Sequence, residues 1–399
     1  MVTYYYKFCL LILLCHFTLY SQTLDLFKTG RPICKIEKNE ITFETRGHII
    51  YVKVRLNNST IEYNFVIDTG AFTCIDQELA ETLGFQKGSP LITSGHINSA
   101  YMIKDDVSIH LKDMVVENFK MVAMDFSYFK KTDPKINGFL GSNFLRFFNV
   151  LIDYNRKHLI LSQNSIKQNY SRENNYLKLD LNNHAGLPKV PCQVNNYWQT
   201  KALLDTGSPF AITFPISFLN KFSFSEKKHF KESVGIFASW PWIPIKKNYL
   251  GRLDAFKIGD IKIQNVPVIF ANTEDIILGE EFLSQFKINI NFPEKYLTLT
   301  PYSKVNLKDN YISIGLKLNK DETNKTYVEA YWKDSPADRA GIKLNDEIIQ
   351  INSLETRNLG MNDINRILNN DRILKIDLVI EKSLRWKRYV LNKEPLLPL

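Results

Sequence analysis

Cysteine and histidine are scarce in this sequence. Among 399 residues there are 5 Cys and 7 His. Cys9 and Cys15 lie in an apolar N-terminal stretch, which leaves Cys34, Cys74 and Cys192 for the rest of the chain. Three cysteines at irregular spacing exclude a disulfide framework and a cysteine-based zinc site, although one bridge stays open. The histidines have no metal-binding spacing and no P-loop occurs, so neither a metal nor a cofactor is predicted.

Dense blocks of one charge are also absent. The formal net charge is +9, from 51 Lys plus Arg against 42 Asp plus Glu, and these residues are scattered along the chain. No Arg-Gly repeats and no interleaving of aromatic with basic residues occur, so the pattern predicts no nucleic-acid partner. A hydrophobic fraction of 44% and a charged fraction of 23% are typical of a chain with a large folded core.

The sequence has no long apolar run after its first twenty residues. Within them, Lys7 precedes the apolar run Phe8 to Leu14, and the small Ser21 suits cleavage before Gln22. The run is short for a bilayer span. We therefore predict a secretory signal at residues 1–21, export to the periplasm or the cell exterior, and no membrane span in the mature chain. An uncleaved N-terminal anchor is the less favoured alternative.

The body of the chain contains an internal repeat. One copy reads Phe65-Val66-Ile67-Asp68-Thr69-Gly70-Ala71, and the other reads Ala202-Leu203-Leu204-Asp205-Thr206-Gly207-Ser208. Each copy later has two apolar residues and a glycine, in Phe139-Leu140-Gly141 and Ile277-Leu278-Gly279. The two aspartates are 137 residues apart (205 − 68) and the two later glycines are 138 apart (279 − 141). Such constant spacing indicates duplication of a whole structural unit.

The sequence around these motifs predicts β-strands. Residues 49–56 and 107–111 carry apolar runs bounded by turn residues. In the second copy, residues 255–270 predict three strands, with turns at Gly259-Asp260 and Gln264-Asn265. Helices are expected to be short. The sequence therefore predicts a mainly β body with one Asp-Thr-Gly motif in each half.

From about Tyr311 the pattern changes to that of a small α+β module. Ile312 to Leu318 predicts a strand, and Ser335-Pro336 followed by Gly341 predicts a short capped helix. Met361 to Asn369 has the pattern of a longer helix. Residues 345–352 predict a turn and a strand, and further strands are predicted at 373–380 and 386–391.

Paired aspartates suggest acid–base chemistry. Two carboxylates held close together cannot both ionise, so one proton is shared and the pair offers an acid and a base together. We predict Asp68 and Asp205 as this catalytic pair. Thr69 and Thr206 would lock the two loops together through their hydroxyls.

The glycines and the residue that follows them have separate predicted roles. Gly70 and Gly207 allow tight turns that bring amide donors near the carboxylates. Ser208 can donate a hydrogen bond to a carboxylate, whereas Ala71 in the first loop cannot. We therefore expect Asp205 to be the more acidic member of the pair.

On these motifs, residues 41–301 resemble the pepsin and retropepsin superfamily of aspartic proteases. The resemblance implies that Asp68 and Asp205 form the catalytic dyad and that the two later glycine motifs support the active-site loops. The short spacing is similar to that of fused retropepsin-like pairs of bacteria. It implies two β-barrel halves of a bilobal protease, at 22–165 and 166–302, and a complete site in a monomer.

The same resemblance implies a flap hairpin over the cleft in each half. These hairpins would lie near residues 94–103 and 235–245, with Tyr101 and Trp240 as their aromatic residues. The alternative is that both aromatics are packing residues in loops.

Within a predicted C-terminal domain at 303–399, residues 311–391 resemble a PDZ domain, on Ile314-Gly315-Leu316, Ser335-Pro336-Ala337 and Ala340-Gly341-Ile342. The resemblance implies that Ile314, Gly315 and Leu316 line a peptide-binding loop and that a peptide or protein terminus is the ligand. Ser313 stands where the family usually has a glycine, which puts carboxylate capture in doubt. The alternative is a module that only packs against the protease.

Together these patterns predict an exported aspartic endopeptidase that acts on peptide or protein substrates. The main alternative is a non-catalytic binding protein that keeps the protease fold and acts through its PDZ module. A protease dedicated to one partner protein is a third possibility. Because both Asp-Thr-Gly motifs are intact, the enzyme is the favoured interpretation.

Overall fold

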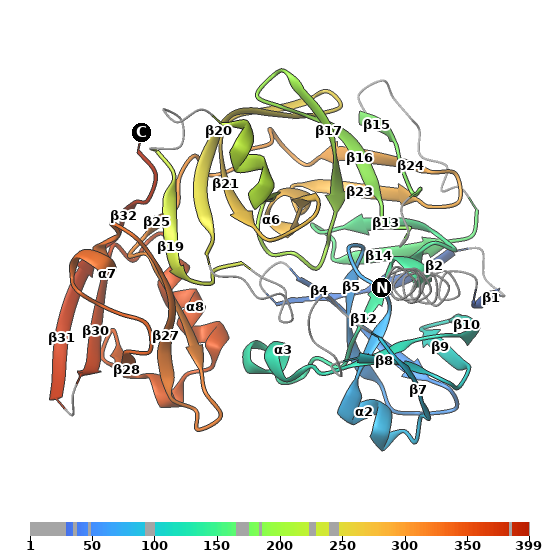
Figure 1. The fold of residues 1–399 in the computed structure, drawn as a ribbon. Helices are drawn as coiled ribbons and strands as arrows, with labels where there is room; N and C mark the ends of the chain where they lie inside the picture. Colours follow the sequence, from blue (N-terminus) through green and yellow to red (C-terminus); the bar gives the residue numbers. More distant parts are fainter. Residues whose placement is uncertain are drawn as a thin grey trace, which may run out of the picture.

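β-Strands make up most of the described part of the chain, as predicted (Figure 1). The computed structural model describes residues 29–34, 38–46, 49–91, 100–164, 175–182, 186–222, 229–238, 247–382 and 385–398. The predicted signal at 1–21 and the flap candidate Trp240 lie outside the described residues.

The first copy of the repeat forms a sheet of eleven described strands. Their order is β1-β10-β9-β4-β5-β12-β6-β11-β8-β7, with β3 paired to β4. The strands are β1 (Arg31–Cys34), β3 (Glu44–Arg46), β4 (Ile49–Leu56), β5 (Tyr63–Asp68), β6 (Cys74–Asp76), β7 (Lys87–Pro90), β8 (Ala100–Ile103), β9 (Val107–Leu111), β10 (Met114–Phe119), β11 (Val122–Met124) and β12 (Gly138–Gly141). Three short helices accompany them: α2 (Gln77–Thr82), α3 (Ser127–Thr132) and α4 (Ser142–Leu145).

The strand that leads to Asp68 is buried on both faces. Successive side chains of a strand point to opposite sides of its sheet. Phe65 and Ile67 therefore enter the main hydrophobic core, while Val66 enters a second cluster with Phe139. This double burial explains why the run before Asp68 is continuously apolar instead of alternating.

The strand pairings around Asp68 recur around Asp205. In the first copy, β5 and β12 are parallel, β12 and β6 antiparallel, and β6 and β11 parallel. In the second, β17 and β22 are parallel, β22 and β18 antiparallel, and β18 and β21 parallel. The elements of the second copy are β16 (Lys189–Val194), β17 (Trp198–Leu204), β18 (Ile212–Pro215), η1 (Ile216–Lys221), β19 (Lys231–Gly235), β20 (Tyr249–Ile258), β21 (Ile261–Ala271), β22 (Ile276–Leu278) and α6 (Glu280–Leu283). The sequence repeat is thus also a repeat of strand topology.

A six-stranded sheet joins the two copies, in the order β15-β24-β23-β13-β14-β2. At its centre β13 runs antiparallel to β23, so the closing hairpins of the two copies are hydrogen-bonded to each other. Its strands are β2 (Lys38–Thr42), β13 (Asn149–Asp153), β14 (His158–Ser162), β15 (Asn175–Lys178), β23 (Phe286–Asn291) and β24 (Tyr296–Pro301).

One predicted turn is wrong. The expected turn at Gln264-Asn265 lies inside the continuous strand β21, which forms a long hairpin with β20. Asn265 has a φ of 51°, and the pairs on either side of Asn265 and Asp254 keep one register. The turn-forming Asn therefore takes the left-handed conformation within the hairpin without reversing the chain or shifting its register.

The C-terminal segment has a hydrophobic core of its own, built from its strands and from α8. Its elements are β25 (Ile312–Ser313), β26 (Leu316–Lys320), β27 (Thr326–Trp332), α7 (Pro336–Arg339), β28 (Glu347–Ile351), β29 (Leu354–Glu355), η2 (Thr356–Asn358), α8 (Met361–Asn369), β30 (Lys375–Lys382), β31 (Arg385–Asn392) and β32 (Glu394–Pro395). The single strand predicted at 312–318 is broken at Gly315, whose φ is 83°. A Cβ atom there would lie 2.2 Å from the Cβ atom of Ser335, so glycine is required.

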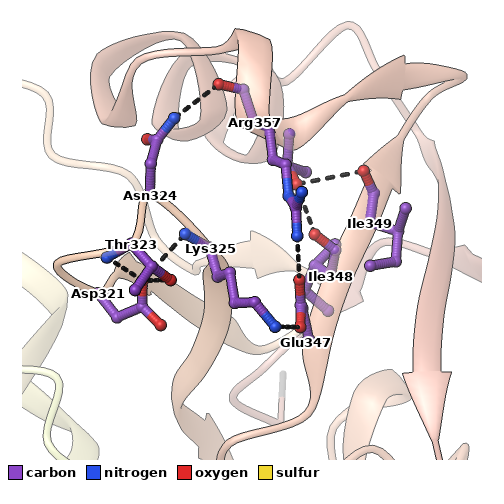
Figure 2. Close-up of polar contacts among 9 residues, drawn as sticks. Asp321, Thr323, Asn324, Lys325, Glu347, Ile348, Ile349 and Arg357 are labelled. Atoms are coloured by element: carbon purple, nitrogen blue, oxygen red, sulfur yellow. Dashed lines mark hydrogen bonds and ion pairs between the residues drawn. The ribbon is translucent and has the colours of Figure 1, made fainter. Parts of the chain in front are cut away.

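Polar contacts fix the far end of the β26–β27 hairpin (Figure 2). The Lys325 ammonium pairs with the Glu347 carboxylate at 2.8 Å, and the Arg357 guanidinium lies 3.6 Å from the same carboxylate. The Asn324 amide donates to the Arg357 carbonyl at 2.9 Å. These contacts connect the hairpin to β28 and η2.

The C-terminal segment is joined to the second copy through a shared sheet. Strand β19 pairs with β20 on one side and with β27 on the other (Figure 1). Phe237, just after β19, stacks on Trp332 with ring centroids 4.2 Å apart. Helix α3 of the first copy also contacts α8. The segment that its sequence pattern sets apart is therefore continuous with the rest of the sheet.

Candidate active site

The two aspartates lie where two apolar strands end. Asp68 is the last residue of β5, paired with Gly141 of β12, and Asp205 follows β17 directly. The Asp205 N–H donates to the Leu278 carbonyl at 2.9 Å. Each aspartate is thus held beside the apolar-apolar-Gly motif of its own copy.

The later glycines are required by close backbone packing. A Cβ atom at Gly141 would lie 2.3 Å from the Ala71 carbonyl oxygen, and one at Gly279 would lie 2.2 Å from the Phe210 carbonyl oxygen. Both distances are far below van der Waals contact. The loops that carry the aspartates, residues 68–71 and 205–208, therefore rest on a surface that has no room for a side chain.

Thr69 and Thr206 join the two loops by reciprocal hydrogen bonds. The Thr69 hydroxyl donates to the Leu204 carbonyl and the Thr206 hydroxyl donates to the Ile67 carbonyl, both at 2.7 Å. Each hydroxyl also accepts from the backbone N–H of the other threonine, at 3.1 and 3.2 Å. Both threonines are fully buried. Four hydrogen bonds thus cross between the two copies beside the aspartates.

The same loops bring the two carboxyl groups together. Gly70 N–H donates to Asp68 Oδ1 and Gly207 N–H donates to Asp205 Oδ1, both at 2.9 Å. A Cβ atom at Gly70 would lie 2.4 Å from Asp205 Cγ, and one at Gly207 would lie 2.4 Å from Asp68 Oδ2. Each carboxyl therefore fits against the glycine of the opposite loop, a place where only glycine leaves room.

The electrostatics of the site favour one shared proton. Asp68 is 2% exposed and Asp205 is 0% exposed. Burial raises the pKa of Asp205 to about 6. Burial, the negative charge of Asp205 and a hydrogen bond with its carboxyl raise the pKa of Asp68 well above its usual value. Two coupled carboxyls that are both buried do not both ionise readily, so the pair keeps one shared proton when one carboxyl is charged.

The backbone donors act alike on the two carboxyls. The N–H groups of Gly207 and Ser208 and the Asp68 side chain lower the pKa of Asp205. The N–H groups of Gly70 and Ala71 lower the pKa of Asp68 in the same way. The greater acidity of Asp205 and the contribution of the Ser208 hydroxyl therefore stay predictions.

Tyr101 is the one flap candidate within the described residues. It lies in β8, between β7 and β11, and only 7% of it is exposed. Its hydroxyl is buried without a hydrogen-bond partner among the described groups, and the Lys87 ammonium lies 5.3 Å from its ring centroid. The ring belongs to the main core, which is the packing alternative considered for this residue.

Sequence reasoning missed Glu280 and Tyr154. The Tyr154 hydroxyl donates to Glu280 Oε1 at 2.5 Å, and Glu280 is fully buried. Burial and the charges of the aspartate pair raise the pKa of Glu280 well above its usual value. Comparison of the two copies could have drawn attention to Glu280, because it follows Gly279 at the position where the first copy has Ser142 after Gly141.

The predicted peptide-binding loop of the C-terminal segment is partly occupied from within. Ile314 and Leu316 are buried, on either side of Gly315. The Gly315 N–H donates to the Ser313 hydroxyl at 3.0 Å. Strand β32, near the C-terminus, pairs with Ile312–Ser313. Ser313 therefore uses an amide that carboxylate capture would need.

Metal sites, disulfides and membrane spans were looked for in the part of the chain that the structure describes. There, no group of three or more His, Cys, Asp or Glu side chains is placed to hold a metal ion. Cys74 and Cys192 are buried free thiols, so neither forms a disulfide. No helix among the described residues is long and apolar enough to cross a membrane.

Residues 52–144 match the family model described as aspartyl protease. An aspartic-protease-like domain is therefore present. The matched range contains Asp68, Thr69, Gly70 and Gly141, and it ends before Asp205. Among solved structures, the chain is similar to basic 7S globulin from soybean, with 11% identity and a TM-score of 0.40 over 69% of this chain and 98% of that chain. No curated protein matches the chain.

Proposed function

We propose that the chain is an aspartic endopeptidase whose catalytic dyad is Asp68 and Asp205. The observation that carries this proposal is that two buried carboxyl groups, one from each copy, each lie against the glycine of the opposite loop, between loops joined by Thr69 and Thr206. Burial of a lone carboxyl pair without a cation is costly. Such a pair is expected where one shared proton serves a reaction.

The expected order of acidity assigns the two roles in hydrolysis. The ionised Asp205 takes a proton from water as the water oxygen bonds to the peptide carbonyl carbon, and Asp68 gives its proton to the carbonyl oxygen. Proton transfer to the peptide nitrogen then lets the C–N bond break, releasing an amine and a carboxylic acid. The backbone donors at Gly70 and Gly207 keep both carboxyls oriented throughout.

We extend the proposal to the organisation of the chain. Residues 22–165 and 166–302 act as the two halves of one bilobal protease, which is supported by the recurring strand pairings and the six-stranded sheet between them. Because both loops come from one chain, a monomer suffices for activity. Residues 1–21 direct export to the periplasm or the cell exterior, a proposal that the sequence alone supports.

We also propose that residues 303–399 form a PDZ-like module that binds a peptide segment. In support, β26 pairs only with β27 among the described strands, and α8 contacts β26. An edge strand beside a helix can accept an added peptide strand. Because the Gly315 amide already serves Ser313, we favour an internal strand of a substrate over a free C-terminus as the ligand.

The test of the proposed hydrolysis is cleavage of a diverse peptide library by the purified chain from pH 3 to pH 8. Asp68→Asn and Asp205→Asn are compared with Asp254→Asn, which changes an exposed aspartate outside both loops. We expect wild type and the Asp254 variant to cleave the same peptides and both loop variants to be inactive. Equal cleavage by either loop variant would refute the dyad. No cleavage by folded wild type would instead favour the binding-protein alternative.

A further inference from the structure

Glu280 occupies the position that corresponds to Ser142 of the first copy. The Ser142 N–H donates to the Ala71 carbonyl at 2.8 Å, and the Glu280 N–H donates to the Ser208 carbonyl at 2.7 Å. Each residue thus holds the last residue of an aspartate loop by the same backbone contact. The side chains differ, since one is a small hydroxyl and the other a fully buried carboxyl.

The Glu280 carboxyl is held from the other copy. Tyr154, which follows β13 of the first copy, donates its hydroxyl to Glu280 Oε1 at 2.5 Å. The second oxygen, Oε2, is buried and has no hydrogen-bond partner among the described groups. Burial and the unpartnered oxygen favour the protonated carboxyl, whereas the hydrogen bond from Tyr154 favours the ionised one. Glu280 is therefore suited to keep its proton at moderate pH and to lose it at higher pH.

The charges near Glu280 are negative or neutral. The charges of Asp205 and Asp68 raise the pKa of Glu280, and the Tyr154 hydroxyl contacts its carboxyl from the end of β13. Beyond Tyr154 lie the Tyr302 hydroxyl and Asp153, joined by a 3.0 Å hydrogen bond. Among the described residues, no Lys or Arg forms an ion pair with Glu280, although Lys287 lies 3.8 Å from Asp153.

Three buried acids therefore share one region, so the ionisation of each opposes the ionisation of the others. The two aspartate carboxyls lie against opposite loops of one site, so the second ionisation of that pair puts two charges close together. Glu280 is bonded to the second loop through its N–H and the Ser208 carbonyl, and the Tyr154 hydroxyl stabilises its ionised form. We therefore expect Glu280 to ionise before the pair gives up its shared proton.

We propose that Glu280 is a positioning residue of the proposed protease: its carboxylate, held by Tyr154 behind the Ser208 loop, supplies the negative charge that keeps the shared proton on the aspartate pair towards higher pH. Like charges raise each other's proton affinity, so this effect is reciprocal. It extends the alkaline side of the activity range without any contact between Glu280 and the substrate. This inference rests on the proposed function.

The test compares the pH dependence of kcat/KM for wild type, Glu280→Gln and Tyr154→Phe. Gln keeps the shape and the hydrogen-bond acceptor but never ionises, and Phe removes the donor that favours ionised Glu280. We expect the alkaline limb to move to lower pH by about one unit in Glu280→Gln and by less in Tyr154→Phe. The control is Glu281→Gln, the same change one residue further along the helix, which should keep the wild-type profile.

An unchanged alkaline limb in a folded Glu280→Gln enzyme would overturn the proposal, as would a shift to higher pH. Equal loss of activity at every pH would also overturn it, because the residue would then be needed for structure or chemistry alone. A readout without catalysis separates this inference from the proposed function. Stability is measured against pH for Glu280→Gln, alone and with Asp68→Asn and Asp205→Asn. The pH-dependent gain in stability from Glu280→Gln should be smaller in the variant with both aspartates changed to Asn than in the wild-type background. An equal gain in stability in both backgrounds refutes the coupling between Glu280 and the aspartate pair.

Discussion

Removal of the Thr69 hydroxyl tests how strongly the two copies are joined. In Thr69→Val, the side chain keeps its shape but loses the bond to the Leu204 carbonyl at 2.7 Å and the bond from Thr206 N–H at 3.2 Å. Both remaining partners would be buried without water. Each unsatisfied buried group costs about 1–3 kcal/mol, so the free energy of unfolding should fall by about 2–5 kcal/mol.

The assay is denaturant unfolding followed by tryptophan fluorescence at a fixed pH. Thr206→Val breaks the mirror-image pair of bonds, so its loss should match that of Thr69→Val within about 1 kcal/mol. Thr73→Val is the control, because its buried hydroxyl accepts one bond, from Gly141 N–H at 3.0 Å, within the first copy. It should lose about 1–2 kcal/mol. If Thr69→Val loses no more than this control, the threonines do not join the copies as argued.

Three further changes probe the pair and its surroundings. Burial raises the pKa of Asp205 to about 6, so the stability that its protonated form contributes is lost as pH rises through that value. Asp205→Asn avoids this loss and should gain about 2–3 kcal/mol of stability relative to wild type between pH 4 and pH 8. Unfolding measured at several pH values tests this, and a stability difference that does not change with pH contradicts it. Gly70→Ala should reduce cleavage about 100-fold, because its Cβ atom would lie 2.4 Å from Asp205 Cγ, and near-normal kinetics would disprove the contact. Trp332→Ala should lower the free energy of unfolding by about 3–5 kcal/mol, because this ring is 4% exposed and stacks on Phe237. Trp386→Ala, at a ring that is 70% exposed, should change it by less than about 0.5 kcal/mol. Equal effects of the two variants in thermal melts would show that the shared sheet does not depend on the stacking.

Much of the candidate site could be predicted from local sequence. An apolar run before Asp-Thr-Gly specifies a buried strand that ends in a tight turn, and its repetition at constant spacing places two such turns in equivalent surroundings. The short helix that starts at Ser335-Pro336, and the helix Met361–Asn369, could be predicted because caps and periodicity are local.

Other features depended on contacts between distant residues, which no local pattern reports. Asn265 is a residue type typical of turns, yet pairing with β20 on both sides of it keeps β21 continuous and in one register. The donors to Asp205 proved to be backbone amides, which look the same in every residue of a sequence. Glu280 reads as an ordinary helix-start carboxylate until Tyr154, 126 residues earlier, is placed against it.

By itself, the sequence determined the residue chemistry of this protein and its order along the chain: two carboxylates, two threonines, and glycines where the backbone must turn or pack closely. The tertiary structure alone decided which of these groups meet. Carboxyl acidity depends on burial and on neighbouring charge, and both arise only when the two copies close on each other. For the same reason, only the folded chain shows that β19 and β27 join the C-terminal segment to the second copy, since strand pairing has no sequence signature of its own.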